Sequence, residues 1–387
     1  MKVSILGLVS LMVAGVWAGQ ASATIRVATF NVSMEADNYL PRGEQGDQQV
    51  LIERLASGDE VQIQNVAEII QRTRPDILFL TEFDYIADPG KGVEAFSTNY
   101  LQVAQGGQQP IDYPYYYYAS VNTGQPSPYD LDRDGVASGT GADAWGFGSY
   151  PGQYGMLVLS KYPINKDQVR TFQQFKWKDM PDYLPTRTAD GDDWYSEEAW
   201  QDFPLSSKSH WDLPIEVDGE TLHLLASHPT PPVFDGPENR NGIRNHDEIR
   251  FWRDYIHNAE YIYDDRDQSG GLAAHQRFFI VGDLNASADE GDGIRSGIAG
   301  LLNDELVQGA VEPVSPGAAV HSESPYAASH TAAWGMRADY VIPSVYGVTV
   351  LDSGVFWPAA GEPGHALVSS RGASSDHRLV WLDVRLK

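Results

Sequence analysis

The chain has 387 residues and no cysteine, and its 53 acidic side chains against 27 lysines and arginines give a net charge of −26. The absence of cysteine excludes disulfide bonds and a lipid anchor attached through a cysteine. Nonspecific binders of nucleic acid gain most of their affinity by neutralising phosphates with lysine and arginine, so this acidity disfavours nucleic acid as a partner without excluding it.

The first 23 residues have the pattern of a secretory signal peptide. Lys2 precedes an apolar run from Val3 to Ala18, and Ala21-Ser22-Ala23 supplies the small residues that precede a cleavage site. The run is short for a membrane span, which makes a membrane anchor the weaker alternative. We expect cleavage near Ala23, a secreted or periplasmic protein, and no transmembrane segment in the mature chain.

Strands and helices are mixed in the segment that follows. Residues 24–32 are expected to form a first strand. Apolar residues recur with helical spacing over residues 59–72, and the inward stripe is Val61, Ile63, Val66, Ile69 and Ile70. Pro75 ends this helix, and further strands are expected at residues 76–81 and 156–160.

Two aromatic insertions interrupt this pattern. Residues 84–153 are rich in glycine, proline and tyrosine, and residues 170–212 carry four tryptophans, Trp177, Trp194, Trp200 and Trp211. Aromatic loops beside an active site can form a wall for the substrate. They can equally pack against the scaffold as a second, smaller core, and the sequence leaves both alternatives open.

The second half of the chain repeats the mixture of strands and helices. A hairpin is expected at residues 213–217 and 221–226, because Asp218-Gly219 between them is a strong turn signal. A long amphipathic helix is expected over about residues 245–263, and strands at 278–281, 338–342 and 379–384. This order predicts an α/β fold with two stacked sheets flanked by helices.

Polar residues follow the apolar strands at several strand ends. Asp283 and Asn285 share one face at the end of such a strand, where a carboxylate and an amide can position a water molecule and hold a developing oxyanion. The other strand-end residues of this kind are Asn31, Glu82, His228, Asp339, Asp376 and His377. Because they are spread along the whole chain, we expect one domain over residues 24–387.

In their order, these motifs resemble the endonuclease/exonuclease/phosphatase superfamily, which has the deoxyribonuclease I-like fold, and the leader suggests a secreted, bacterial-type member. The resemblance implies a four-layer α/β sandwich with two stacked mixed sheets. It also implies that Asp283 aligns the attacking water, that Asn285 orients it, and that His228 donates to a phosphate oxygen. His377 would contact the scissile phosphate and be oriented by Asp339.

A hard divalent cation fits the remaining strand-end residues. Glu82 ends an apolar strand, where an unpaired carboxylate is costly to bury. Asn31 would add a neutral oxygen, and Asp376 would belong to the same metal region. These oxygen ligands suit Mg²⁺, with Mn²⁺ or Ca²⁺ as alternatives.

Four residues are candidates for binding the substrate. Tyr154 lies where the superfamily often has an active-site tyrosine. Lys208 lies where its nucleases place a phosphate-contacting arginine, and this departure puts a nuclease role in doubt. Arg240 and Arg244 precede the long helix, and arginines at a helix N-terminus suit an anion, although exposed arginines are usually only solvated.

A separate acidic segment, Asp130-Leu131-Asp132-Arg133-Asp134-Gly135, has the spacing of the first half of a calcium loop. The twelfth position of an EF-hand would be Gly141, so a full EF-hand is not supported. A looser structural Ca²⁺ site with Asp130, Asp132 and Asp134 is expected, and an ordinary acidic turn is the alternative.

These observations favour a secreted, divalent-metal-dependent phosphoester hydrolase. It would be a phosphodiesterase or phosphatase that acts on a small or lipid-like phosphoester by in-line attack of water, and we expect a monomer. An extracellular deoxyribonuclease I-like endonuclease is the alternative. A non-catalytic binding module on the same fold is a weaker one, since no motif is eroded.

Overall fold

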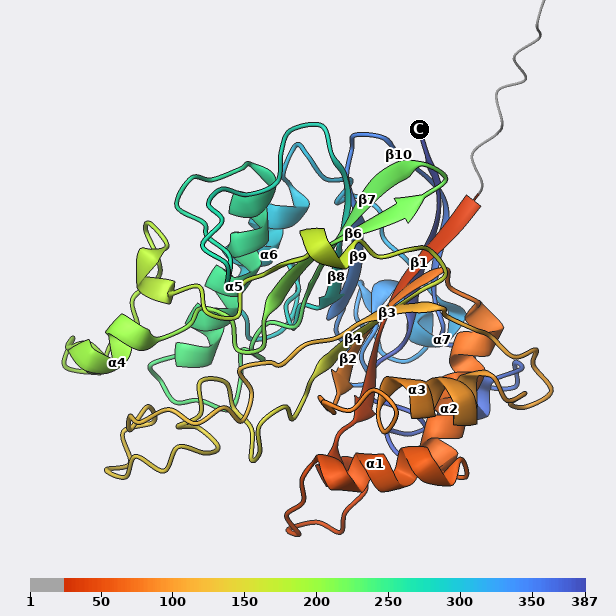
Figure 1. The fold of residues 1–387 in the computed structure, drawn as a ribbon, viewed down its shortest axis with the longest axis horizontal. Coiled ribbons are helices and arrows are strands. Elements are labelled where there is room, and N and C mark those ends of the chain that lie inside the picture. Colours follow the sequence, from red (N-terminus) through yellow and green to blue (C-terminus); the bar gives the residue numbers. More distant parts are fainter. Residues whose placement is uncertain (1–23) are drawn as a thin grey trace, which may run out of the picture.

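The computed structural model describes residues 24–387. The predicted signal peptide lies outside the described residues. Within residues 24–387, no helix combines the length and the apolar character needed to cross a membrane. The described chain forms two β-sheets with helices on their outer sides (Figure 1).

The first sheet has six strands and is built around β1, which is parallel to β2 and antiparallel to β11. In spatial order its strands are β10 (Val348–Val355), β11 (Val380–Leu386), β1 (Thr24–Met34), β2 (Ile77–Phe83), β4 (Met156–Ser160) and β3 (Tyr115–Tyr117).

The second sheet has five strands, and its only parallel pair is β7 with β8. In spatial order they are β5 (Arg170–Thr171), β6 (His210–Val217), β7 (Glu220–Ser227), β8 (Arg277–Asp283) and β9 (Asp339–Pro343). The turn between β6 and β7 is Asp218-Gly219, and both residues have positive φ, as the predicted hairpin requires.

The helices divide between the two sheets. Near the first sheet lie α1 (Gln48–Ser57), α2 (Val61–Thr73), α3 (Val93–Phe96) and α7 (Pro316–Ala319), and near the second sheet lie α5 (Arg240–Ile256) and α6 (Arg295–Leu302) (Figure 1). The short helix α4 (Glu197–Asp202) lies farther out, beyond α5 (Figure 1). Short 3-10 turns, among them η1 (Ala36–Asn38), join these elements.

Alternate residues of β8 show how the layers are held together. Phe279 and Val281 belong to the apolar cluster between the sheets, whereas Phe278 and Ile280 belong to the cluster beneath α5 and α6. All four side chains are buried. The chain is therefore a four-layer α/β sandwich with two mixed sheets, as predicted.

The boundaries of the long helix differ from the prediction. It begins at Arg240 rather than about residue 245 and ends at Ile256 rather than 263. His257 leaves the helical conformation, and Asn258 has a φ of 54°, which reverses the chain. Ile262 is nevertheless buried, so its apolar character was a correct sign of burial but a wrong sign of helix.

The second insertion packs as a core rather than as an exposed wall. Trp177 is fully buried, and its Nε1 donates to Asp247 of α5 at 2.7 Å. Trp200 and Phe203 pack on Trp177, with ring centroids at 5.3 and 5.9 Å. Trp194 ties the two insertions together, because its Nε1 donates to the carbonyl oxygen of Leu131 at 2.9 Å.

Candidate active site

Asp283 lies at the centre of a buried polar cluster at the end of β8. Its Oδ2 accepts from the Asn31 amide at 3.1 Å and lies 3.4 Å from Nε2 of His228 and 3.5 Å from Nε2 of His377. Its Oδ1 accepts from the backbone N–H of Asn285 at 3.0 Å. Residues from the ends of β1, β7 and β8 therefore meet on one carboxylate.

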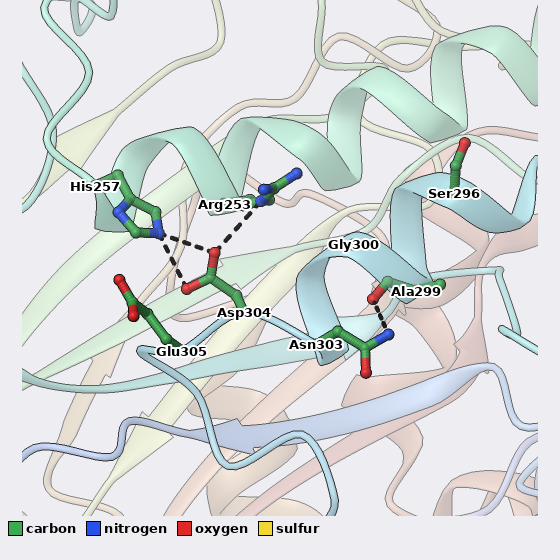
Figure 2. Close-up of a pocket in the computed structure, with 8 residues that line it drawn as sticks. All are labelled: Arg253, His257, Ser296, Ala299, Gly300, Asn303, Asp304 and Glu305. Carbon is green, nitrogen blue, oxygen red and sulfur yellow. Dashed lines mark hydrogen bonds and ion pairs between the residues drawn. The ribbon is translucent and has the colours of Figure 1, made fainter.

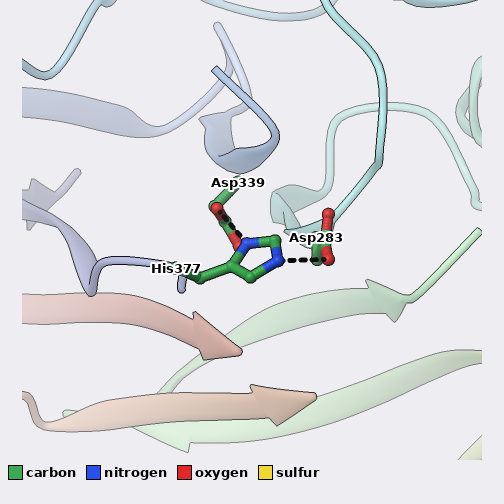
Figure 3. Close-up of side chains that lie close together, drawn as sticks. All are labelled: Asp283, Asp339 and His377. Atoms are coloured by element: carbon green, nitrogen blue, oxygen red, sulfur yellow. Dashed lines mark hydrogen bonds and ion pairs between the residues drawn. The ribbon is translucent and has the colours of Figure 1, made fainter. Parts of the chain in front are cut away.

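His377 bridges two carboxylates (Figure 3). Its Nδ1 lies 2.9 Å from Oδ2 of Asp339, and its Nε2 faces Asp283. The Thr331 hydroxyl donates to the same Asp339 oxygen at 2.7 Å and accepts from the backbone N–H groups of Ala338 and Asp339. The Asp339 carboxylate is thereby fixed, and it fixes the imidazole in turn.

The two histidines of the cluster differ in charge. Burial opposes the charged form of His377, but Asp339 and Asp283 outweigh burial and raise its pKa to about 10. Burial, reinforced by Lys208, lowers the pKa of His228 to about 4. Burial alone would raise the pKa of Asp283, but His377, His228 and Asn31 hold it below its usual range. Near neutral pH the cluster therefore combines an anion, a cation and a neutral imidazole.

The backbone is unusual at this edge. Ser33, Glu82, Tyr154 and Asn285 all have φ between 50° and 56°, in the left-handed region that residues with a Cβ seldom occupy. At Gly282 a Cβ would lie 1.9 Å from the Ser227 carbonyl oxygen, so only glycine lets β8 run this close to β7. Such backbone strain is typical of positions that hold functional groups in place.

Glu82, Asn31 and Asp376 form the part of the site that could hold a metal ion. Glu82 makes no ion pair within residues 24–387, and burial raises its pKa to about 7, with His377 and Asn31 acting in the opposite direction. The neighbouring Asp376 and Asp283 raise that pKa further. Glu82 is half-buried, and a carboxylate at a strand end with other carboxylates nearby fits a hard divalent cation.

A tighter group of ligand-type atoms consists of Asp283, Asp339 and His377, whose atoms lie within 4.8 Å of one another. His377 Nδ1 is already engaged with Asp339 in this group. One ligand-type atom of this group is thus already used, and Glu82, Asn31 and Asp376 stay the predicted metal ligands.

Tyr154 and Lys208 both border the cluster. Lys208 is buried, which lowers its pKa, while Glu248, Glu82 and Asp283 act in the opposite direction. Burial raises the pKa of Tyr154, and the nearby carboxylates, Glu35 and Glu82 first among them, raise it further. Lys208 thus supplies positive charge beside Asp283, and Tyr154 remains a neutral phenol.

The two predicted arginines are not drawn into this cluster. The Arg244 guanidinium is buried and donates to the carbonyl oxygens of Leu205, Trp145 and Pro204. Arg240 pairs with Glu238 and lies over the ring of Trp194. Both arginines have partners that support the local fold, and no contact between either of them and Asp283 is seen within residues 24–387.

The predicted calcium loop is a compact turn on the surface. Carboxylate oxygens of Asp130, Asp132 and Asp134 lie within 4.8 Å of one another. Asp143 supports the turn, because its Oδ1 accepts from the backbone N–H of Leu131 and its Oδ2 accepts from Ser138. Calcium at this loop stays a prediction.

Sequence reasoning missed two residues that support the site, Thr331 and Trp334. Thr331 holds Asp339, as described above, and the ring of Trp334 packs against His377. Both lie in the loop before β9, which has no periodic pattern. The one local signal was Trp334-Gly335, a large aromatic residue at a glycine turn.

Residues 28–377 match the sequence profile of the Endonuclease/Exonuclease/phosphatase family. The chain belongs to this family. Members of the endonuclease/exonuclease/phosphatase family are in general hydrolases that act on phosphoesters, in keeping with a carboxylate, two histidines and an amide gathered at one sheet edge. No curated protein sequence matches the chain.

Solved structures of family members and other proteins have similar folds. The endonuclease/exonuclease/phosphatase from Beutenbergia cavernae is 15% identical, with a TM-score of 0.47 over 94% of this chain and 72% of that one. Sphingomyelinase C from Streptomyces griseocarneus is 16% identical, with a TM-score of 0.48 over 94% and 99%. A beta toxin variant from Staphylococcus aureus is 13% identical, with a TM-score of 0.46 over 94% and 100%. These likenesses concern the fold, and nothing about the substrate follows from them.

Proposed function

We propose that the protein is a secreted, divalent-metal-dependent hydrolase of a small or lipid-like phosphoester. The observation that carries the proposal is the convergence of Asn31, His228 and His377 on one carboxylate oxygen of Asp283. A buried anion held by a hydrogen bond from Asn31 and flanked by two imidazole nitrogens is arranged to act on a reacting group beside it, because its position is fixed before the substrate arrives.

In the proposed reaction, Asp283 accepts a hydrogen bond from the attacking water and directs a lone pair toward phosphorus. Its low pKa suits it to orient the water more than to retain the proton. The new P–O bond forms in line with the bond to the leaving group while an O–H bond of the water breaks. The leaving oxygen departs with its electron pair and takes up the proton that Asp283 relays. His377, protonated near neutral pH, donates to a non-bridging phosphate oxygen, and Asn285 supports the same developing charge.

Glu82, Asn31 and Asp376 would hold the divalent cation, and Mg²⁺ is the ion that their oxygen atoms suit best. When bound, such an ion neutralises charge on the phosphoryl group. Lys208 is buried on the side of Glu82 and Asp283, and its amine would donate to the phosphoryl group. Asp339 and Thr331 keep His377 in its orientation throughout.

The substrate class rests on charge. With a net charge of −26, the chain is poorly suited to the long phosphate backbone of a nucleic acid, and the arginines predicted to grip an anion are engaged within the fold. An extracellular nuclease remains the second candidate, favoured by the family. Digestion of plasmid with divalent ion would support the nuclease, and hydrolysis of sphingomyelin or p-nitrophenyl esters alone would support the small-substrate enzyme.

The test of the proposed reaction is Asp283→Asn, assayed on bis-p-nitrophenyl phosphate, p-nitrophenyl phosphate, sphingomyelin and plasmid. Loss of the orienting carboxylate should lower kcat by about 10²- to 10⁴-fold while the volume is kept. Asp292→Asn, the same change at an exposed position, should keep the wild-type rate. If Asp283→Asn retains more than about a tenth of that rate, the role given to Asp283 is wrong.

A further inference from the structure

A cavity adjoins the candidate active site. It has a volume of about 340 Å³ and lies between η1, the ends of α1 and α2, and the segment 371–374. Ser33 lines it, and the Ser33 hydroxyl donates to Oδ1 of Asp376 at 3.3 Å and contacts Ser375 at 3.0 Å. Since Asp376 precedes His377, the cavity and the catalytic cluster share this wall.

Two arginines line the cavity in a strongly acidic protein. The charged lining residues are Arg54, Arg371 and Glu60, and Asp376 lies beside Arg371. A larger cavity of about 590 Å³ beside α6 has a different lining (Figure 2). There a single carboxylate, that of Asp304, accepts hydrogen bonds from both Arg253 and His257.

Arg371 has a largely exposed guanidinium. Its side chain is 62% exposed, and its Nε forms an ion pair of 3.6 Å with Asp376, which is too long for a hydrogen bond. Its one hydrogen bond within residues 24–387 is a long one of 3.3 Å, donated to Asn38. Buried arginines of this chain, such as Arg244, instead donate to several carbonyl oxygens.

Arg54 faces the same space from α1. Its side chain is 44% exposed and pairs with Glu60 at 3.2 Å, an exposed contact of small energy that a ligand can replace. Arginine presents a planar fork of donors that matches phosphate in geometry, and two arginines from separate segments can hold one phosphate from two sides.

We propose that this cavity binds a second phosphate group of the substrate, carried by the same molecule as the scissile phosphoester. The inference rests on the proposed function, because it takes the scissile group to lie at Asp283 and His377. The substrate would then be a bisphosphorylated small molecule whose body passes Ser33 and Asp376. The volume, about ten times that of a water molecule in the liquid, accommodates a phosphate with part of its carrier.

The test is calorimetric binding of alkanediol bisphosphates with spacers of about two to eight carbons, compared with the matching monophosphates, because affinity gain peaks when the spacer fits the span. Wild type should bind one spacer length roughly ten times more tightly than its monophosphate, since two charge-assisted contacts are added. Arg54→Gln and Arg371→Gln should each reduce that advantage roughly three- to tenfold. Arg295→Gln, an exposed arginine of α6, is the matched control and should keep it.

The outcomes separate this inference from the proposed function. If no spacer is favoured by wild type, or if both variants keep the advantage, the second phosphate site is wrong. A third outcome is that only Arg371→Gln loses the tighter binding of the bisphosphate and that the Mg²⁺ dependence of binding also shifts. In that case Arg371 acts through Asp376, and the second phosphate site is wrong. Tighter binding of the bisphosphate that depends on both arginines supports the second phosphate site, whether or not the protein hydrolyses a phosphoester. Absence of hydrolysis together with such binding would overturn only the proposed function.

Discussion

Trp334 packs edge-on against His377, with ring centroids 4.8 Å apart and ring planes at 83°. The indole lies at the tip of a tight hairpin whose Ala333 N–H donates to the Asp376 carbonyl oxygen at 2.7 Å. Yet 53% of its surface is exposed. An exposed indole packed on the candidate catalytic imidazole restricts the orientations of that imidazole and leaves an apolar face open beside it.

Trp334→Ala should therefore raise KM and lower kcat, each roughly two- to tenfold, because aromatic contacts of this kind contribute about 0.5 to 1.5 kcal/mol. Trp334→Phe should recover most of both parameters. Steady-state kinetics on bis-p-nitrophenyl phosphate would measure the change. Phe234→Ala removes an even more exposed ring, 88% open to solvent, and should change neither parameter. If Trp334→Ala behaves like that control, the indole has no role in the reaction.

Glu82→Gln should raise the Mg²⁺ concentration needed for half-maximal activity by about tenfold or more, because a charged oxygen ligand becomes neutral. The raised pKa of Glu82 adds a pH effect: below about pH 7 the wild-type carboxylate takes up a proton that competes with the ion. The metal requirement of wild type should therefore increase as the pH falls through 7. The Mg²⁺ requirement of Glu82→Gln should not change with pH in this range.

Glu44→Gln, at an exposed position, is the control for the metal titration. A rate defect in Glu82→Gln with an unchanged Mg²⁺ midpoint would remove Glu82 from the set of metal ligands.

The strand-end motifs could be predicted because they depend on local geometry. A strand of alternating or continuous apolar residues has an identifiable end, and Asp283 is the last residue of β8. The expected shared face does not extend to Asn285, because its φ of 52° leaves the strand and its side-chain amide donates to the Pro229 carbonyl oxygen. The parallel pairs β1–β2 and β7–β8 then bring separate strand ends together, as the family resemblance implied.

Other parts of the site depend on tertiary contacts that leave no periodic signal. Thr331, Trp334 and Arg371 lie in irregular loops, and their partners Asp339, His377 and Asn38 are specified only by the folded chain. Arg244 illustrates the opposite error. A basic residue near a helix start suggested an anion site, whereas burial gives its guanidinium three carbonyl partners.

His210 should make the protein less stable in mild acid. It is buried, its Nε2 lies 2.8 Å from the Glu248 carbonyl oxygen, and its Nδ1 contacts the Ser206 hydroxyl, so both nitrogens are satisfied by the neutral ring. Burial lowers its pKa to about 4, against an ordinary value of 6.5. Between these values the unfolded chain binds a proton that the native chain does not. Stability is therefore complete above about pH 6.5 and is lost as the pH falls toward 4.

The free energy of unfolding of wild type, measured with urea, should change more steeply between pH 6.5 and 4 than that of His210→Gln, by up to about 1.4 kcal/mol per pH unit. His228 contributes in the same direction in both proteins and cancels in the difference. The slopes of the free energy of unfolding against pH are compared, because His210→Gln also changes that free energy at every pH. Equal slopes would mean that the native imidazole at position 210 is free to take up a proton.

Calcium should stabilise the turn formed by Asp130, Asp132 and Asp134. The three carboxylates lie close together, and burial, followed by repulsion from Asp143, Asp134 and Asp130, raises the pKa of Asp132. Backbone N–H groups of Asp134 and Gly135 donate to Asp130 and hold the turn in shape. A hard cation would convert the repulsion into coordination, and binding to the folded turn alone would add about 2.7 kcal/mol at one hundred times the dissociation constant.

Calcium should accordingly raise the melting temperature of the wild-type protein by several degrees in calorimetric scans. Mg²⁺ at the same concentration should raise the melting temperature less through this turn, because Mg²⁺ demands a stricter coordination geometry. The triple variant Asp130→Ala, Asp132→Ala, Asp134→Ala should lose the calcium response and keep Mg²⁺-dependent hydrolysis at low temperature, since none of the three lines the site around Asp283. Identical melting of both proteins with and without calcium would leave the segment an acidic turn, held by the backbone contacts to Asp130 and by the capping of Leu131 and Ser138 by Asp143.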